Sequence, residues 1–311
     1  MTPRRRAYFA WVVVCLVWGT TYTAIRIALD TLPPFLMAGF RWTAAGALLI
    51  AAVSARGEPL PSPRSWPALA LLGVLFLGFG NGAVVWAELT VPSGLAAVLV
   101  ATMPFWMVGI EAMRPDRERL SASHVAGLVV GFIGIVLLVG PQIDFGAGRG
   151  FLVGVLSTQL ACLGWAVGST YARRRSAHEN VLTAAAFEML FGGLALLAVG
   201  VALNEWRTMV INPRTGGAVL YLIVVGSIAG FSAYAYALKH LPVATVSLYA
   251  YVNPIIAVIL GTLLLREPFT VRMAVGAALI FAGVCLVRSP RLSSFEPQAL
   301  DGAPRQSSPG T

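Results

Sequence analysis

Runs of about 20 apolar residues follow one another along almost the whole 311-residue chain. A helix needs roughly 20 such residues to cross the hydrocarbon core of a bilayer. Only helices and closed barrels satisfy their backbone in lipid, and these runs lack the alternation of barrel strands. The sequence therefore predicts an all-α polytopic membrane protein with ten transmembrane helices. The predicted spans lie near residues 8–28, 33–53, 66–87, 92–112, 122–140, 150–170, 181–203, 217–238, 242–264 and 270–288.

The composition and charge agree with membrane burial. Only 11% of the residues are charged, whereas a soluble domain carries about a quarter. The net charge of +9 does not indicate nucleic-acid binding, because the basic residues are sorted by side. We place fifteen of the 22 Lys and Arg residues on the side that holds the N-terminus, five on the opposite side and two, Arg26 and Arg41, within spans. This positive-inside bias predicts that both termini face the cytoplasm.

The two halves of the chain resemble each other at an offset of about 150 residues. Because each half has an odd number of predicted spans, five, the second copy enters the membrane from the opposite side. Inverted repeats of this kind are typical of secondary transporters, whose binding site lies near the bilayer midplane between the repeats. We expect a first five-helix repeat over 1–145, an inverted second repeat over 146–289 and a disordered cytoplasmic tail over 290–311. The matching pairs are Trp18/Trp165, Arg26/Arg173, Phe40/Phe187, Gly46/Gly193, Pro92/Pro242, Pro104/Pro254, Glu118/Glu267, Gly127/Gly276 and Gly134/Gly283.

A set of motifs in a particular order carries a resemblance to a known family. The motifs are Trp18-Gly19 in the first span, Arg41 in the second, the hairpin "PSGLAAVLVATMP" and the loops with Glu118 and Glu267. Together they resemble the EamA family of the drug/metabolite transporter superfamily, over essentially the whole chain except the tail. The resemblance implies ten spans, cytoplasmic termini and efflux of small metabolites. It also implies that spans 1–4 and 6–9 line a central cavity, and with the short loops it favours a bacterial plasma (inner) membrane.

Two ionisable residues lie deep in predicted spans. Such groups are costly in a membrane, at roughly 2.5–3.5 kcal/mol near its centre, and by default they mark function. Arg41 lies about 12 Å from the outer end of the second span at the helical rise per residue, and Glu188 occupies the equivalent position of the second repeat. We expect Arg41 to attract an anionic group of the substrate, and Glu188 a cationic group or a proton. Neutralisation by neighbours for folding alone is the alternative.

Charged residues at the ends of spans are candidates for gates. Glu88 ends the third span on the outer side near Arg26, and an ion pair between them would form an outer gate. A glutamate that reaches into the membrane interface is the alternative. Lys239 is the candidate for an inner gate, with Glu179 or the phospholipid surface as its partner. Glu188 and Glu88 are the candidates for proton coupling.

Aromatic and polar residues in the cavity-lining spans suit an amphipathic or aromatic cargo. Trp and Tyr also gather at membrane interfaces, which is the alternative for part of this set. Besides Arg41 and Glu188, the expected substrate-binding residues are Trp18, Tyr22, Asn81, Trp86, Trp165, Tyr234, Tyr249 and Asn253.

Pro104 and Pro254 fall within the fourth and ninth spans, where a proline kinks a helix and can act as a hinge.

Motifs of several enzyme classes are missing from the sequence. The only lysine, Lys239, follows Leu238, so the chain has no Walker GK[ST] sequence. The three histidines, His124, His178 and His240, show no metal-ligand spacing. We therefore predict a secondary transporter, not an enzyme, without metal or cofactor, that exports small amino-acid-like or aromatic metabolites by alternating access. Its partners would be the small-molecule substrate and the lipid bilayer, with no nucleic acid. A passive channel and a membrane-embedded enzyme are the alternatives.

Overall fold

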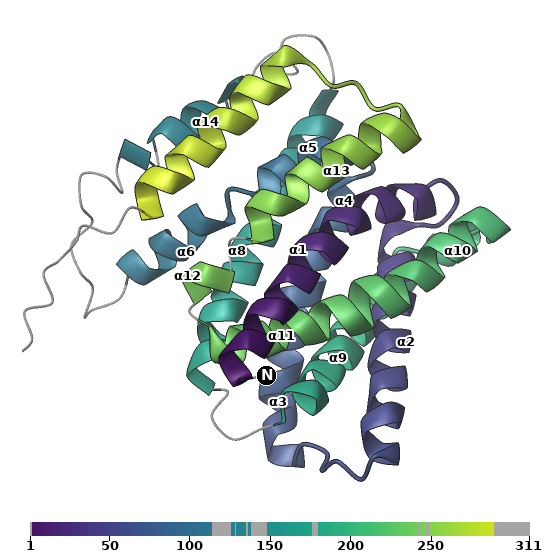
Figure 1. Ribbon diagram of the computed structural model, residues 1–311. Helices are drawn as coiled ribbons and strands as arrows, with labels where there is room; N and C mark the ends of the chain where they lie inside the picture. Colours follow the sequence, from purple (N-terminus) through teal and green to yellow (C-terminus); the bar gives the residue numbers. More distant parts are fainter. Residues whose placement is uncertain are drawn as a thin grey trace, which may run out of the picture.

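The computed structural model describes residues 2–113, 126–127, 129–134, 136–137, 148–175, 180–241, 243–246 and 249–288, and every regular element in them is helical (Figure 1). Six helical stretches are long and apolar enough to cross a membrane: Pro3–Ala28, Pro34–Ala55, Pro63–Ala87, Arg149–Ala172, Val181–Ala202 and Pro213–His240. They coincide with the first, second, third, sixth, seventh and eighth predicted spans. Shorter apolar helices cover Ser93–Met107, Tyr249–Leu265 and Val271–Gly283. Parts of the fifth predicted span and the whole tail lie outside the described residues.

The described part of the chain is a succession of helices joined by short turns. Their bounds are α1 (Pro3–Ala28), α2 (Pro34–Ala55), α3 (Trp66–Gly73), α4 (Ala83–Ala87), α5 (Ser93–Val100), α6 (Met103–Ala112), α8 (Gly148–Arg175), α9 (Val181–Ala202), α10 (Pro213–Tyr221), α11 (Gly230–His240), α12 (Val243–Val246), α13 (Tyr249–Leu265) and α14 (Val271–Arg288). Short 3₁₀ turns cover Pro63–Ser65 and Glu205–Arg207. We call the end of the bundle with the start of α1 the N-terminal end, and the opposite end the far end.

Two of the crossing stretches contain wide π-helical turns. Val74–Gly82 joins α3 to α4, and Leu222–Ala229 joins α10 to α11. The two segments start about 150 residues apart, so they occupy the same position in each half of the chain. π-Helical turns are rare and frequently lie at functional sites.

The fourth predicted span is broken. α5 ends at Val100 and α6 begins at Met103, with Ala101 and Thr102 in a turn between them. Pro104 therefore lies in the first turn of α6, where its missing N–H has no partner to lose. Pro104 thus follows closely on a break in this span, and Pro254 lies inside α13. The hinge role of both prolines stays a prediction.

α2 and α9 pack against each other through glycines. A Cβ atom on Gly46 would stand 2.5 Å from the backbone nitrogen of Leu190, and one on Gly193 would stand 2.4 Å from that of Thr43. These separations are too short for any side chain, so the two backbones touch directly. Small residues allow this close approach in membrane proteins, where apolar burial gives no driving force between helices.

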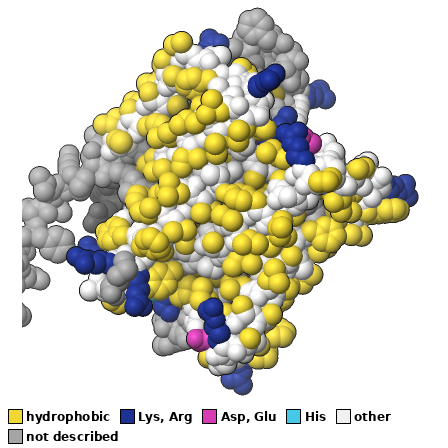
Figure 2. Space-filling model, turned by 45° about the vertical axis from the view of Figure 1, so that its right-hand side comes forward, with side chains coloured by type: hydrophobic (Ala, Val, Ile, Leu, Met, Phe, Trp, Pro, Cys, Tyr) yellow, Lys and Arg dark blue, Asp and Glu magenta, His cyan; other side chains and the backbone are white. Residues whose placement is uncertain are grey.

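The outer surface of the bundle is apolar. Figure 2 shows hydrophobic side chains over the middle of the visible face, with Lys and Arg near its periphery. Exposed leucines include Leu48, Leu156, Leu220 and Leu263. Contiguous exposed apolar surface marks a contact with lipid or protein, and the arrangement fits a bundle surrounded by lipid. α14 lies at the edge of the helical bundle (Figure 1).

Adding one methyl group at the α2–α9 contact is expected to destabilise the protein. Gly193→Ala places a Cβ against the Thr43 backbone, and overpacking of this kind costs about 1–3 kcal/mol. Gly217→Ala on α10 is the matched control, because no atom lies within 4 Å of its added Cβ. Thermal unfolding of the purified protein in detergent measures both variants. Equal midpoints for the two variants would contradict a close backbone contact.

Candidate central cavity

Four aromatic side chains from four helices meet in the interior. The ring centroids of Trp18 (α1) and Trp165 (α8) lie 5.3 Å apart at an interplanar angle of 88°. Tyr234 (α11) and Tyr249 (α13) lie 5.1 and 5.0 Å from Trp18. Trp18 meets Trp165 and Tyr249 edge to face, an arrangement that is favourable for aromatic rings at such distances. All four side chains are buried, so they form a fixed group at the centre of the bundle.

A buried cavity lies beside this aromatic group, and we call it the central cavity. Its volume is about 60 Å³. This volume holds a few water molecules but is far below the roughly 300–1,000 Å³ of ordinary ligand pockets. We call this arrangement, with its small cavity, the contracted state. Seven of the ten sequence-predicted substrate-binding residues line the cavity: Trp18, Tyr22, Arg41, Asn81, Trp165, Tyr249 and Asn253.

Arg41 brings a positive charge into the central cavity from α2. Its side chain is only 2% exposed. The Nε atom donates a 2.7 Å hydrogen bond to Ser227 Oγ, and the guanidinium carbon lies 4.4 Å from the centre of the Trp42 ring. The Nη1 atom is buried without a hydrogen-bond partner among the described residues. Since buried donors are normally satisfied, the unpaired nitrogen indicates a place for a further acceptor.

The other polar groups around the cavity are held by internal hydrogen bonds. Trp18 Nε1 donates to the carbonyl oxygen of Gly226 at 3.0 Å, in the second π-helical turn. Trp165 Nε1 donates to the Tyr234 hydroxyl at 2.9 Å, and that hydroxyl also bonds Ser169 at 2.8 Å. Trp42 Nε1 donates to Asn81 Oδ1 at 2.7 Å. These bonds fix the orientation of the rings.

A second cavity lies nearer the N-terminal end, and we call it the Glu188 cavity. Its lining includes Glu188, Lys239, Phe76, Phe231 and Tyr234, and its volume is about 70 Å³. Phe76 and Tyr234 pack directly on Trp165, with centroids 5.0 and 5.4 Å away. Aromatic rings therefore separate the two cavities. Arg41 and Glu188, for which the sequence predicts equivalent positions, line different cavities.

The predicted contact between Arg26 and Glu88 runs through the backbone. Arg26 Nη1 donates to the carbonyl oxygen of Glu88, not to its carboxylate. Glu88 is 0% exposed, and neither carboxylate oxygen has a hydrogen-bond partner among the described residues. The two residues are neighbours at the far end, as expected, but their side chains form no ion pair in the described part of the chain. The gate that they would form stays a prediction.

Some site residues differ from their sequence-based expectation. Trp86 is half-buried on α4 and lines neither cavity. Lys239 is exposed at the edge of the Glu188 cavity, while its predicted partner Glu179 lies outside the described residues. Sequence reasoning also missed Ser227, although it is the only hydroxyl in the apolar run "LIVVGSIAG" that faces the inside of the bundle.

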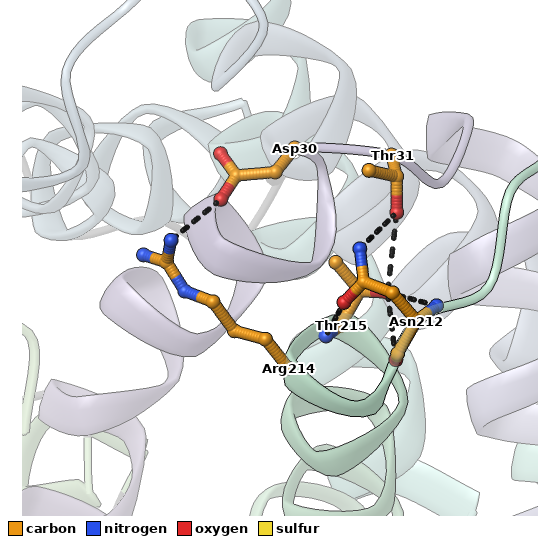
Figure 3. Close-up of polar contacts among 5 residues, drawn as sticks. All are labelled: Asp30, Thr31, Asn212, Arg214 and Thr215. Carbon is orange, nitrogen blue, oxygen red and sulfur yellow. Dashed lines mark hydrogen bonds and ion pairs between the residues drawn. The ribbon is translucent and has the colours of Figure 1, made fainter.

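Polar contacts between the two halves of the chain close the far end. Figure 3 shows Arg214 reaching Asp30, at 3.5 Å, and Asn212 and Thr215 grouped around Thr31. The Thr31 hydroxyl donates to Thr215 Oγ1 at 3.1 Å and accepts from Asn212 Nδ2 at 3.4 Å. These bonds join the end of α1 to the start of α10.

Two glutamates of the second half cap helices of the first half. Glu267 accepts hydrogen bonds from Ser93 N at 2.9 Å, Ser93 Oγ at 2.8 Å and Gly94 N at 3.1 Å, at the start of α5. Glu205 accepts from Leu36 N at 2.8 Å, at the start of α2. The first N–H groups of a helix have no partner within the helix, and a carboxylate there also interacts favourably with the helix dipole.

The structure thus has a small buried cavity with a single arginine inside a bundle of membrane-length helices, and comparison with known proteins gives the class and family of the protein. The sequence profile of the EamA-like transporter family matches residues 5–140 and 152–289. The chain therefore belongs to the EamA-like transporter family, and it is a multi-pass membrane transporter of the EamA type.

Individual relatives agree with this family. The chain is 38% identical over 250 residues to the uncharacterized inner membrane transporter YedA of Escherichia coli (strain K12), covering 79% of each chain. It is 28% identical over 290 residues to protein PecM of Dickeya dadantii (strain 3937), covering 92% of this chain and 93% of PecM. A crystal structure with 25% sequence identity matches with a TM-score of 0.66, covering 91% of this chain and 96% of its own.

Removing the Tyr234 hydroxyl is expected to destabilise the aromatic group. Tyr234→Phe leaves the buried Trp165 N–H without an acceptor, which costs about 1–3 kcal/mol. Tyr221→Phe is the matched control, because its hydroxyl bonds Thr20 at a half-buried position. We expect a clearly lower unfolding midpoint for Tyr234→Phe than for Tyr221→Phe, measured by intrinsic tryptophan fluorescence during heating. A lower unfolding midpoint for Tyr221→Phe than for Tyr234→Phe would contradict the stabilising role of the bond between Tyr234 and Trp165.

Proposed function

We propose that this protein is a secondary transporter that exports small organic metabolites across a bacterial inner membrane by alternating access. The central cavity is the cargo site, and the observation that carries the proposal is its enclosed position between two halves of a membrane-spanning bundle. Both termini face the cytoplasm, in keeping with the positive-inside bias. The similarity to YedA, which is named as an inner membrane transporter, supports this location.

The two halves act as inverted five-helix repeats over 1–145 and 146–289. Reciprocal contacts support this proposal. Gly46 meets Leu190 and Gly193 meets Thr43, so equivalent residues exchange roles across the contact. Likewise, Gly134 meets Gly276 and Gly283 meets Gly127. Reciprocal contacts of this kind are expected on either side of a two-fold axis.

Transport proceeds by moving the cargo between the two ends of the bundle. In the contracted state, the far end is held by the contacts of Asp30, Thr31 and Glu267, while the Glu188 cavity lies toward the N-terminal end. Cargo enters through the Glu188 cavity and passes the rings of Phe76 and Tyr234 into the central cavity. The far-end contacts then break and release it on the other side.

The remaining charged residues and the prolines have roles in this cycle. Arg26 and Glu88 form part of the far-end gate, and Lys239 belongs to the gate at the N-terminal end. Glu188 or Glu88 carries the proton that couples export to the proton gradient, because each is a buried carboxyl group beside a cavity or gate. Pro104, at the break between α5 and α6, and Pro254, inside α13, are the hinges.

Export is tested by changing a cavity tryptophan in cells that overexpress the protein. A screen of metabolites and toxic analogues first identifies compounds against which the protein protects. Trp18→Phe removes the indole N–H and alters the cavity wall, so we expect at least a tenfold loss of protection. Trp86→Phe is the matched control, since Trp86 lines neither cavity, and expression at the membrane is equalised by immunoblot.

Counterflow in proteoliposomes separates a carrier from a passive channel. A carrier gives saturable uptake that is stimulated by unlabelled substrate on the opposite side, whereas a channel gives unsaturable flux without counterflow. Unsaturable flux, or loss of protection in Trp86→Phe equal to that in Trp18→Phe, would overturn the proposed transport through the central cavity.

Loss of the Glu267 cap is expected to open the far end. Glu267→Ala removes the acceptor for Ser93 and Gly94, and loss of a helix cap costs about 0.5–2 kcal/mol. In a Cys15→Ser, Cys285→Ser background, Cys162 in the central cavity is the single remaining thiol. We expect Glu267→Ala to increase labelling of Cys162 by a membrane-impermeant maleimide from the far side.

The matched control for this labelling is Glu58→Ala. Glu58 accepts a 2.9 Å hydrogen bond from Asn180 at an exposed position of the N-terminal end. Its loss is expected to leave far-side labelling of Cys162 unchanged. Vesicles of both orientations give the two sides separately, and equal far-side rates for Glu267→Ala and the parent would show that Glu267 does not hold this end closed.

A further inference from the structure

We infer that the cargo is an organic monoanion, whose anionic group binds Arg41 and whose apolar body lies among the rings of the central cavity. The inference rests on the proposed function, because that function makes the central cavity the cargo site. The inference restricts the class of transported compound to those that carry a carboxylate or a similar anion, and an ammonium group is not required.

The guanidinium of Arg41 is held in a way that suits the binding of an anion. Its Nε bond to Ser227 and its stacking on Trp42 hold the guanidinium plane in one orientation. Gly226 leaves the room for it, because a Cβ there would stand 3.1 Å from Arg41 Nη2. The buried Nη1 remains without an acceptor among the described residues. A guanidinium with fixed orientation and an open donor binds a planar carboxylate well.

The cavity holds no acidic counterpart. Arg41 is the only charged residue among the described residues that line the central cavity. Glu188 lies in the other cavity, behind Phe76 and Tyr234. Glu88 interacts electrostatically with Arg41 but is not part of the lining. An ammonium group in the central cavity would therefore meet the Arg41 cation and would find no carboxylate in the cavity wall to pair with.

The rest of the lining suits an apolar body. Trp18, Trp165, Tyr249 and Tyr22 supply rings, and Ile25 supplies aliphatic surface. Few polar groups remain open, because the indole N–H groups of both tryptophans already bond protein acceptors. Cargo with many hydroxyl groups would lose its hydration without replacement bonds. The preferred cargo is accordingly an aryl or alkyl carboxylate.

A matched series of three ligands tests the charge preference. 3-Phenylpropionate, phenylalanine and phenethylamine share a phenyl ring on a two-carbon chain, and that chain carries a carboxylate, both groups or an ammonium alone. Isothermal titration calorimetry of the full-length protein in nanodiscs measures their binding. We expect 3-phenylpropionate to bind at least tenfold more tightly than phenylalanine, with phenethylamine weakest. Equal or tighter binding of phenylalanine or phenethylamine, or no binding of 3-phenylpropionate, would overturn the inference.

Variants locate the binding group. Arg41→Gln is expected to weaken 3-phenylpropionate binding at least 30-fold, and Arg41→Lys to restore part of it. Arg207→Gln is the matched control and should leave binding unchanged, because Arg207 also lies beside a tryptophan ring, at 5.2 Å, but is exposed and lines neither cavity. If Arg41→Gln does not fold, Ser227→Ala replaces it, because it keeps the charge but frees Nε and should weaken binding several-fold. Unchanged binding of 3-phenylpropionate in Arg41→Gln, or in Ser227→Ala where it replaces that variant, would show that the ligand binds at another site.

Transport of the same compounds distinguishes this inference from the proposed function. Counterflow of phenylalanine that is insensitive to Arg41→Gln would retain the transporter and overturn the anion site. Arg41-dependent binding of 3-phenylpropionate without counterflow of any compound would support the anion site and overturn the proposed transport.

Discussion

The direct backbone contact between α2 and α9 sets the position of everything around the cavities. Gly46 and Gly193 let the two helices touch, and Gly73 and Gly192 bring α3 equally close to α9. Because the helices cannot slide apart by the width of a side chain, Arg41 on α2 and Glu188 on α9 have fixed places relative to each other. The aromatic group then fills the space that these glycine contacts leave, and it divides that space into two cavities.

Much of the fold could be predicted from the sequence, because burial in lipid leaves few solutions. An apolar run of sufficient length has to form a helix, and six such runs do so where predicted. The cost of a charge in the membrane also singled out Arg41, which is indeed buried at a cavity. Trp18 and Trp165 fall near the middle of their predicted spans, and their rings do meet in the interior, 5.3 Å apart.

Helix rotation and local breaks were beyond the reach of sequence reasoning. Trp86 lies five residues beyond Asn81 on the same crossing stretch but does not line the cavity that Asn81 lines, because packing decides which side of a helix is enclosed. Glu188 is buried as expected, but rings from three other helices separate it from Arg41. The chain breaks before Pro104 because a proline is best accommodated in the first turn of a new helix. Arg26 bonds the backbone carbonyl oxygen of Glu88, and a sequence does not indicate which backbone carbonyl a side chain will bond.

The caps on α2 and α5 have a consequence for how the protein is made. Both capping carboxylates, Glu205 and Glu267, are synthesised long after the helices whose first turns they complete. While the ribosome is still translating the second half, these two helix starts of the first half lack the carboxylates that cap them in the complete protein. Translation proceeds at about 5–20 residues per second, so this incomplete state lasts for seconds. The first half thus reaches its final structure only after the second has been inserted, and the two halves mature as one unit.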